Sequence, residues 1–144
     1  MEKLTASDCE LCQSAGGRIL WRNSLVRVIA VDDPAYPGFC RIVVNRHVAE
    51  MTDLSEDERA CVMGAVFAVE TAVRELVRPD KVNLASLGNV VPHVHWHVIP
   101  RFREDRHFPG SIWSAPLREA APRATVSLEA LAVAITAELG RSGT

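Results

Sequence analysis

The stretch that decides the fold of this chain is residues 93–101, His-Val-His-Trp-His-Val-Ile-Pro-Arg. Three histidines alternate with bulky apolar residues, and in a β-strand residues i, i+2 and i+4 share one face. Valine, isoleucine and tryptophan also favour strands. The pattern therefore predicts a strand that carries His93, His95 and His97 on one face and packs its apolar side chains into a core with the other.

A row of three imidazoles indicates a functional site, because clustered titratable groups are typical of such sites. One chemistry is metal binding, since histidines at i and i+2 can chelate one ion. However, a rise of about 3.3 Å per residue separates the backbones of His93 and His97 by roughly 13 Å, which is too far for all three rings to meet one metal without distortion. The other chemistry is nucleophilic and acid–base work on an anion, for which neutral imidazole is suited near pH 7. The geometry favours this second chemistry, with phosphate as the anion.

The same residues resemble a known family. Residues 93–99 fit the His-x-His-x-His-x-x signature, with x hydrophobic, of the histidine triad superfamily of nucleotide hydrolases and transferases. The resemblance is to the bacterial-type hydrolases of that superfamily, and it covers Cys9 to about Arg103. Further similar segments are residues 100–101, the pre-triad loop 87–92, and residues 37–39 and 43–48.

The resemblance implies a nucleotide hydrolase or transferase that cleaves at the α-phosphate of nucleoside monophosphate esters, anhydrides or amidates, such as dinucleoside polyphosphates or adenylated compounds. His95 would attack the α-phosphorus and form a nucleotidyl–histidine intermediate that water resolves. His97 would bind phosphate oxygens or help the leaving group, and His93 would hold the tautomer of His95, directly or through a backbone carbonyl. The substrate would be a purine nucleotide. The alternative is a nucleotide-binding module with little or no turnover.

Three positions outside the triad are candidate substrate contacts, the first and last of them by the same resemblance and Asn83 by its place in the predicted sheet. Asn89 stands where many members have glutamine, and we expect it to contact phosphate. Asn83 lies on a predicted strand, residues 82–87, beside the triad strand. Its amide contacts phosphate or ribose or, equally well, makes the structural hydrogen bond that a buried amide requires. Asp32 or Asp33 would accept hydrogen bonds from ribose hydroxyls, with a solvated turn carboxylate as the alternative.

A Cys-x-x-Cys pair, Cys9 and Cys12, lies near the start of the chain. It is either half of a zinc site, which needs two more ligands, or two ordinary cysteines. Some triad proteins hold zinc with such a pair plus histidines, and the matching positions here are His47 and, as a further candidate, His93. Such a site would be structural, because its ligands leave no open position on the metal. Catalysis itself would require no cofactor.

The chain departs from the family at two places. Many members carry a fourth histidine where this sequence has Phe39. Several also carry serine or threonine shortly before the first triad histidine, where this sequence has Val90 and Val91. The missing hydroxyl weakens the case for phosphoramidate hydrolysis, because a leaving amine must be protonated. It leaves the nucleophile untouched.

Length and composition set broad limits. The 144 residues predict a single domain, residues 1–144, with its core at about 9–103 and a tail and helix at 104–144. A formal net charge of −2 indicates no nucleic-acid partner, and no apolar run reaches the roughly 18 residues that a membrane span needs. Four cysteines without an export signal indicate a cytoplasmic location. The family resemblance further implies a homodimer, with two sheets joined across a two-fold axis.

The predicted fold class is α+β, with the histidine triad fold: a bent antiparallel sheet of about five strands, a long helix and a C-terminal helix. Ser55 and Glu58 form a capping box for the long helix, which ends before Pro79. Ser127 is the expected N-cap and Gly140 the expected C-cap of the last helix. The remaining strands are predicted at residues 18–22, 25–31 and 39–44.

The segment after the triad strand has few regular features. Its charges, in residues 102–110, predict a solvated loop. Ile112 and Trp113 follow this loop, and we expect them to dock near the site or onto a partner subunit.

Overall fold

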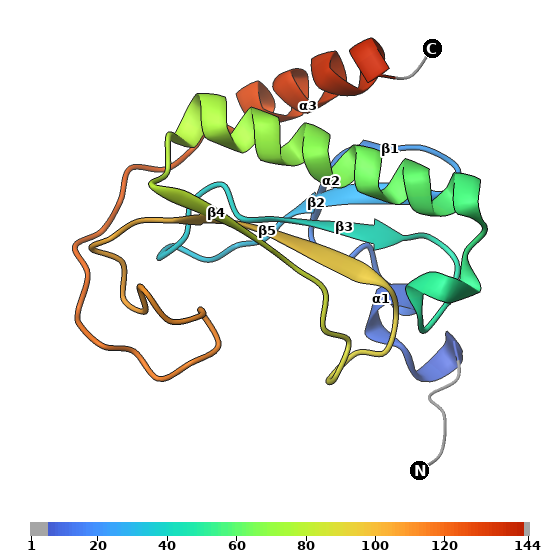
Figure 1. The fold of residues 1–144 in the computed structure, drawn as a ribbon, viewed down its shortest axis with the longest axis horizontal. Coiled ribbons are helices and arrows are strands. Elements are labelled where there is room, and N and C mark those ends of the chain that lie inside the picture. Colours follow the sequence, from blue (N-terminus) through green and yellow to red (C-terminus); the bar gives the residue numbers. More distant parts are fainter. Residues whose placement is uncertain (1–5, 143–144) are drawn as a thin grey trace.

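A computed structural model describes residues 6–142, which form an α+β fold (Figure 1). The predicted domain, residues 1–144, therefore includes a few terminal residues outside the described range. The strands are β1 (Arg18–Arg22), β2 (Val26–Ala30), β3 (Cys40–Val44), β4 (Lys81–Ala85) and β5 (His95–Arg101). The helices are α1 (Glu10–Gln13), α2 (Glu56–Val77) and α3 (Leu128–Ser142), with short 3-10 turns at η1 (Ala6–Asp8) and η2 (Met51–Asp53).

The strands form one antiparallel sheet in the order β1-β2-β3-β5-β4. Consecutive strands are neighbours except where β5 lies between β3 and β4, so the strand that carries the histidines has a neighbour on each side. The expected five-stranded α+β architecture is confirmed, as is the antiparallel pairing of β4 with β5.

One face of the sheet is covered by helices (Figure 1). Alternate side chains of the central strands, such as Val28, Ile42 and Val98, are fully buried there and pack against the apolar stripe of α2. That stripe consists of Val62, Val66, Val69 and Val73, which recur at helical spacing and are fully buried. Because side chains alternate along a strand, the histidines must lie on the other face.

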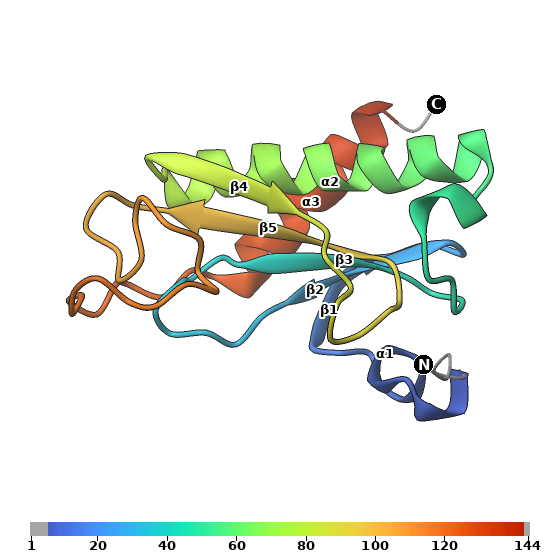
Figure 2. The ribbon, with the colours of Figure 1, turned by 60° about the horizontal axis from the view of Figure 1, so that its bottom comes forward.

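That other face is only partly covered. The view in Figure 2 shows α1 and the N-terminal segment beneath the sheet, on the side away from α2 and α3. The loop of residues 31–39 and the long segment of residues 102–118 lie toward the other end of the molecule. The histidines therefore lie on the side of the sheet that is lined by short segments and loops.

The ends of the helices follow their sequence signals with one exception. The capping box is present in both directions, since Glu58 N–H donates to Ser55 Oγ and Ser55 N–H donates to Glu58 Oε1. Ser127 Oγ accepts the N–H of Ala130, as expected of an N-cap. The predicted end at Gly140 is wrong, because α3 continues to Ser142. A single glycine costs a helix only about 1 kcal/mol, which does not force it to end.

Two further predictions need correction. The triad strand begins at His95 and not at His93, because the His93 N–H donates to Val91 O within a turn and Val94 N–H donates to Val48 O. The charged segment after β5 is not fully solvated, since Asp105 and His107 are buried. Among the helices of residues 6–142, none is long and apolar enough to cross a membrane.

Candidate functional site

Two histidines of the triad lie side by side on β5. His95 is opposite Val43 of β3, and His97 is opposite Arg41. The centroids of the two imidazole rings are 5.0 Å apart, with the rings nearly perpendicular. Their residues expose only 9% and 4% of their surface, so both rings are largely removed from water.

The tautomer of His95 is set by its own backbone neighbourhood. Its Nδ1 lies 2.6 Å from the carbonyl oxygen of His93. A carbonyl can only accept, so Nδ1 carries the proton and Nε2 keeps a free lone pair. Burial lowers the pKa of His95 below its usual value, against the opposing effect of that hydrogen bond. His95 is therefore a neutral imidazole with an unprotonated Nε2, the form that attacks electrophiles.

His97 is held in the opposite tautomer. Arg41 Nε donates a long hydrogen bond of 3.4 Å to Nδ1 of His97, so the proton of His97 is on Nε2. Burial, together with the nearby His95 and Arg41, lowers the pKa of His97 to about 4. At neutral pH His97 is thus an uncharged hydrogen-bond donor through Nε2–H and not an imidazolium acid.

Two aromatic residues flank His97. The Phe39 ring centroid lies 5.9 Å from that of His97, and the Trp113 centroid lies 4.9 Å away, edge to face. Phe39 is buried, whereas Trp113 exposes 51% of its surface. The expectation that residues 112–113 dock near the site is confirmed for Trp113 within a single chain. The exposed part of the Trp113 side chain therefore lies near the histidine pair.

A buried ion pair anchors the segment that carries Trp113. The Asp105 carboxylate accepts two bonds from Arg101, at 2.8 and 3.0 Å, and three from backbone N–H groups of residues 102, 107 and 108. Burial alone would raise the pKa of Asp105, but these bonds hold it well below its usual range. Tyr36 completes the cluster, with its hydroxyl 2.6 Å from His107 Nδ1. The sequence predicts a solvated loop here and carries one local signal of the anchor, the i, i+4 spacing of Arg101 and Asp105.

The predicted substrate-binding residues have three different surroundings. Asn83 pairs with Ile99 in the sheet and so lies on the histidine face, but its Oδ1 accepts a 2.7 Å hydrogen bond from Arg101. Asn89 is exposed in the loop before His93. Asp32 is also exposed and lines a cleft of about 670 Å³ together with Gly17 and Arg123. The structure therefore does not bring these three side chains into one cluster, and their contacts with substrate stay predictions.

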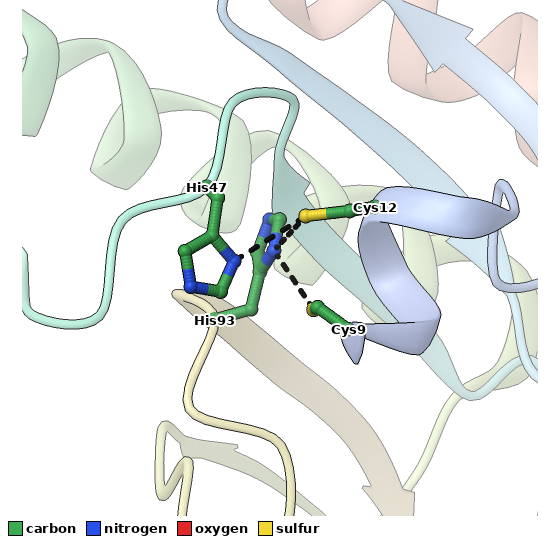
Figure 3. A group of neighbouring side chains, drawn as sticks. All are labelled: Cys9, Cys12, His47 and His93. Atoms are coloured by element: carbon green, nitrogen blue, oxygen red, sulfur yellow. Dashed lines mark hydrogen bonds between the residues drawn. The ribbon is translucent and has the colours of Figure 1, made fainter. Parts of the chain in front are cut away.

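A second cluster forms around the side chain of His93 (Figure 3). Its Nδ1 lies 3.4 Å from the sulfur of Cys9 and 3.4 Å from that of Cys12. The Cys12 sulfur in turn lies 3.3 Å from His47 Nδ1. The prediction that the ring of His93 forms one row with the rings of His95 and His97 is thus wrong, although the predicted link through a backbone carbonyl is present. Its ring points into the cysteine cluster, and its carbonyl reaches His95.

The four side chains fit a zinc ion. Each offers one ligand atom, and all four atoms lie within 4.8 Å of one another. Zinc–sulfur bonds of about 2.3 Å and zinc–nitrogen bonds of about 2.0–2.1 Å imply ligand atoms roughly 3.5 Å apart around a tetrahedron, close to the observed separations. In addition, the Nε2–H of His93 donates to Val44 O at 2.5 Å, which leaves the Nδ1 lone pair facing the cysteines. The donor set, its spacing and the tautomer all suit zinc.

Comparisons with known proteins agree with this architecture. The sequence profile described as the HIT domain matches residues 14–104. An uncharacterised HIT-like protein from Saccharolobus solfataricus is 30% identical over 67% of this chain and 76% of its own length. An AP-4-A phosphorylase from Mycobacterium tuberculosis is 29% identical over 64% of this chain, and the match spans 50% of that longer relative.

Solved structures lead to the same family. A histidine triad protein from Bradyrhizobium japonicum superposes with a TM-score of 0.69 at 26% identity, covering 86% of this chain and 91% of that one. That coverage extends well beyond the residues that carry the signature. On the strength of the domain match, the relatives and the shared fold, this chain belongs to the histidine triad (HIT) family.

Proposed function

We propose that the protein is a nucleotide hydrolase or transferase that cleaves at the α-phosphate of nucleoside monophosphate derivatives. The observation that carries the proposal is the pair of neutral histidines with complementary tautomers, His95 with a free Nε2 and His97 with a donor Nε2–H. Relatives named AP-4-A phosphorylase and bis(5'-nucleosyl)-tetraphosphatase act on substrates of this class by name. The purine base is part of the same proposal.

The first step of the proposed reaction uses His95 as the nucleophile. Its Nε2 forms a bond to the α-phosphorus while the bond to the leaving group breaks, and the bonding electron pair departs with the leaving group. The imidazole becomes cationic, and its Nδ1–H bond to the His93 carbonyl strengthens as that charge develops. His97 donates through Nε2–H to a phosphate oxygen.

The second step returns the enzyme to its starting state. Water attacks the phosphorus, the phosphorus–nitrogen bond breaks, and its electron pair returns to Nε2 of His95. One proton of the water leaves to the solvent. Splitting one displacement into two such steps is the general advantage of a covalent intermediate.

We also propose that Cys9, Cys12, His47 and His93 hold a structural zinc ion. Four protein ligands close the coordination shell, so the metal would tie the N-terminal segment to the sheet and take no part in the chemistry. This assignment rests on the spacing of the ligand atoms and on the tautomer of His93. Zinc ligation requires cysteines that are not oxidised to a disulfide, which is in keeping with the proposed cytoplasmic location.

The homodimer is a further proposal. The strand β4 lies at an edge of the sheet, and Phe67 and Leu76 of α2 expose 53% and 42% of their surfaces. Edge strands and exposed large apolar residues are both typical of surfaces that another chain covers. Light scattering coupled to gel filtration would give the mass in solution, and a monomer at micromolar concentration would contradict the dimer.

The decisive experiment traps the intermediate. Wild-type protein and His95→Ala are mixed with diadenosine tetraphosphate labelled at the α-phosphorus and quenched rapidly. We expect acid-labile label on the wild-type protein only, and almost complete loss of hydrolysis in the variant, with AMP binding and folding retained. Substantial turnover by the variant would rule out the covalent route. Tight nucleotide binding without turnover of any substrate would favour the alternative, a binding module.

A further inference from the structure

One arginine among the described residues, Arg41, contacts the histidine pair. Arg41 is on β3 directly opposite His97, and its Nε donates to Nδ1 of that ring. Its charge also acts on His95, whose pKa it lowers in addition to the larger effect of burial. The Arg41 guanidinium is therefore the positive charge that both reacting histidines share.

This guanidinium has no anionic partner among the residues that the structure describes. The ion pairs found in residues 6–142 involve Arg46, Arg101 and Arg123, and none involves Arg41. Glu10 attracts Arg41 from a distance, but burial has the larger effect and lowers the pKa of the guanidinium. A partly buried and unpaired arginine is costly unless a ligand supplies the negative charge. The contrast with Arg101, which is fully paired with Asp105, marks Arg41 as the cation available to a ligand.

Among residues 6–142, the histidine site has a strong cation but no side chain that readily donates a proton to a leaving group. An arginine side chain stays protonated and does not give up its proton in a protein. The His97 ring accepts from Arg41 and is neutral, so it has no imidazolium proton to deliver. Residues 90 and 91, just before His93, are both valine and carry no hydroxyl, and Val90 exposes 89% of its surface. None of these described side chains therefore supplies a proton to a departing leaving group.

We propose that Arg41 is a catalytic anion-binding residue and that it restricts the enzyme to substrates whose leaving group departs as an anion, namely phosphoanhydrides of nucleoside monophosphates. The inference rests on the proposed function and specifies its substrate class. When the bond between the α-phosphorus and the bridging oxygen breaks, the electron pair stays on that oxygen and the polyphosphate gains one negative charge. The guanidinium stabilises this charge without transferring a proton.

Phosphoramidates place a different demand on the same site. Their leaving nitrogen cannot depart as an amide anion, so a proton must reach it before or during cleavage of the phosphorus–nitrogen bond. Arg41 offers no such proton. The geometry thus predicts a preference for anhydrides over amidates that share the same adenylyl group, and it assigns part of that preference to one residue.

The test compares two substrates and four proteins. Diadenosine tetraphosphate, which releases ATP, and adenosine 5'-phosphoramidate, which releases ammonia, are assayed for AMP release with wild type, Arg41→Gln, Arg41→Lys and Arg74→Gln. The last variant removes the same charge from the exposed surface of α2, on the opposite side of the sheet. Thermal unfolding and AMP binding are measured for each protein, so that loss of fold is separated from loss of catalysis.

The expected pattern is selective. Wild type should prefer the tetraphosphate in kcat/KM, and Arg41→Gln should lose roughly 100-fold on it, in line with removal of one charge-stabilising donor. The same variant should lose less than about fivefold on the phosphoramidate. Arg41→Lys should be intermediate, because lysine keeps the charge but not the planar fork. Arg74→Gln should match wild type on both substrates.

Three results would overturn the inference. Equal losses on both substrates would reduce Arg41 to a general phosphate contact, and a wild-type preference for the phosphoramidate would contradict the substrate class. In both cases, acid-labile nucleotidyl label trapped on wild-type protein but not on His95→Ala would still support the proposed function. Absence of turnover and of label with every substrate would instead reject the proposed function, and the inference with it.

Discussion

The backbone of His93 joins two side-chain clusters, because its carbonyl oxygen accepts the 2.6 Å hydrogen bond of His95 Nδ1 while its ring lies between Cys9 and Cys12. The ring position is fixed from both sides, by the cysteines at Nδ1 and by Val44 O at Nε2. The residue that orients the proposed nucleophile is thus itself held by the proposed zinc ligands.

Metal content provides the first prediction. The protein as isolated should carry about one zinc ion per chain, and Cys12→Ser should lose most of it, whereas Cys61→Ser should keep it because Cys61 lies outside the cluster. Elemental analysis measures both. Chelation should make the N-terminal segment more sensitive to protease without unfolding the sheet. Metal-free protein with an equally resistant segment would contradict the assignment.

The second prediction concerns stability and pH. Unfolded His97 takes up a proton near pH 6.5, whereas the folded residue does so only near pH 4. Between these values the unfolded state binds more protons, so the free energy of unfolding should fall as the pH falls from about 6.5 to about 4. The difference between the two pKa values of His97, 6.5 and about 4, corresponds to a loss of about 3 kcal/mol in the free energy of unfolding.

Urea denaturation of wild type and His97→Gln at pH 7, 5.5 and 4.5 tests this prediction. The variant retains the other histidines and the cysteine cluster, so their contributions are common to both proteins. Its stability should depend less steeply on pH. Parallel curves for the two proteins would show that His97 is not the titrating group.

The buried Arg101–Asp105 pair provides the third prediction. Asp105→Asn removes one partner of a fully buried ion pair and leaves the guanidinium of Arg101 without its counter-charge. Such a change costs about 3–5 kcal/mol in the free energy of unfolding. Glu104→Gln is the matched control, because its pair with Arg123 is largely exposed and should contribute less than about 1 kcal/mol. Similar losses in both variants would contradict the anchoring role of Asp105.

Trp113 provides the fourth prediction. Its indole contacts His97 and is half exposed, so a bound nucleotide should change its surroundings more than those of Trp21 and Trp96. Titration with AMP should therefore change the intrinsic fluorescence of the wild type, and Trp113→Phe should remove most of the change at equal affinity. A full signal in the variant would place the nucleotide near another tryptophan.

Much of the fold could be predicted because its signals are local. The alternation of residues 95–101 and the capping box of Ser55 and Glu58 each depend only on residues close together in one element. The histidine signature identified the family for the same reason, since it is a short contiguous run of residues. At Gly140 the preference of glycine for a helix end was too weak to stop the helix, and α3 continues to Ser142.

The arrangement of the site was decided by tertiary structure. The sequence determined that His95 and His97 share a strand face and that Cys9 and Cys12 form a pair. The family resemblance offered His93 only as a further candidate zinc ligand, and the alternation placed its ring in a row with His95 and His97. The structure decides between these expectations, because β5 begins only at His95 and the turn before it rotates His93 out of the ladder. Nor did the sequence indicate Arg41 as the partner of His97, or Asp105 as a buried anchor. Those contacts depend on strand register and on long-range packing, which no local pattern of residues encodes.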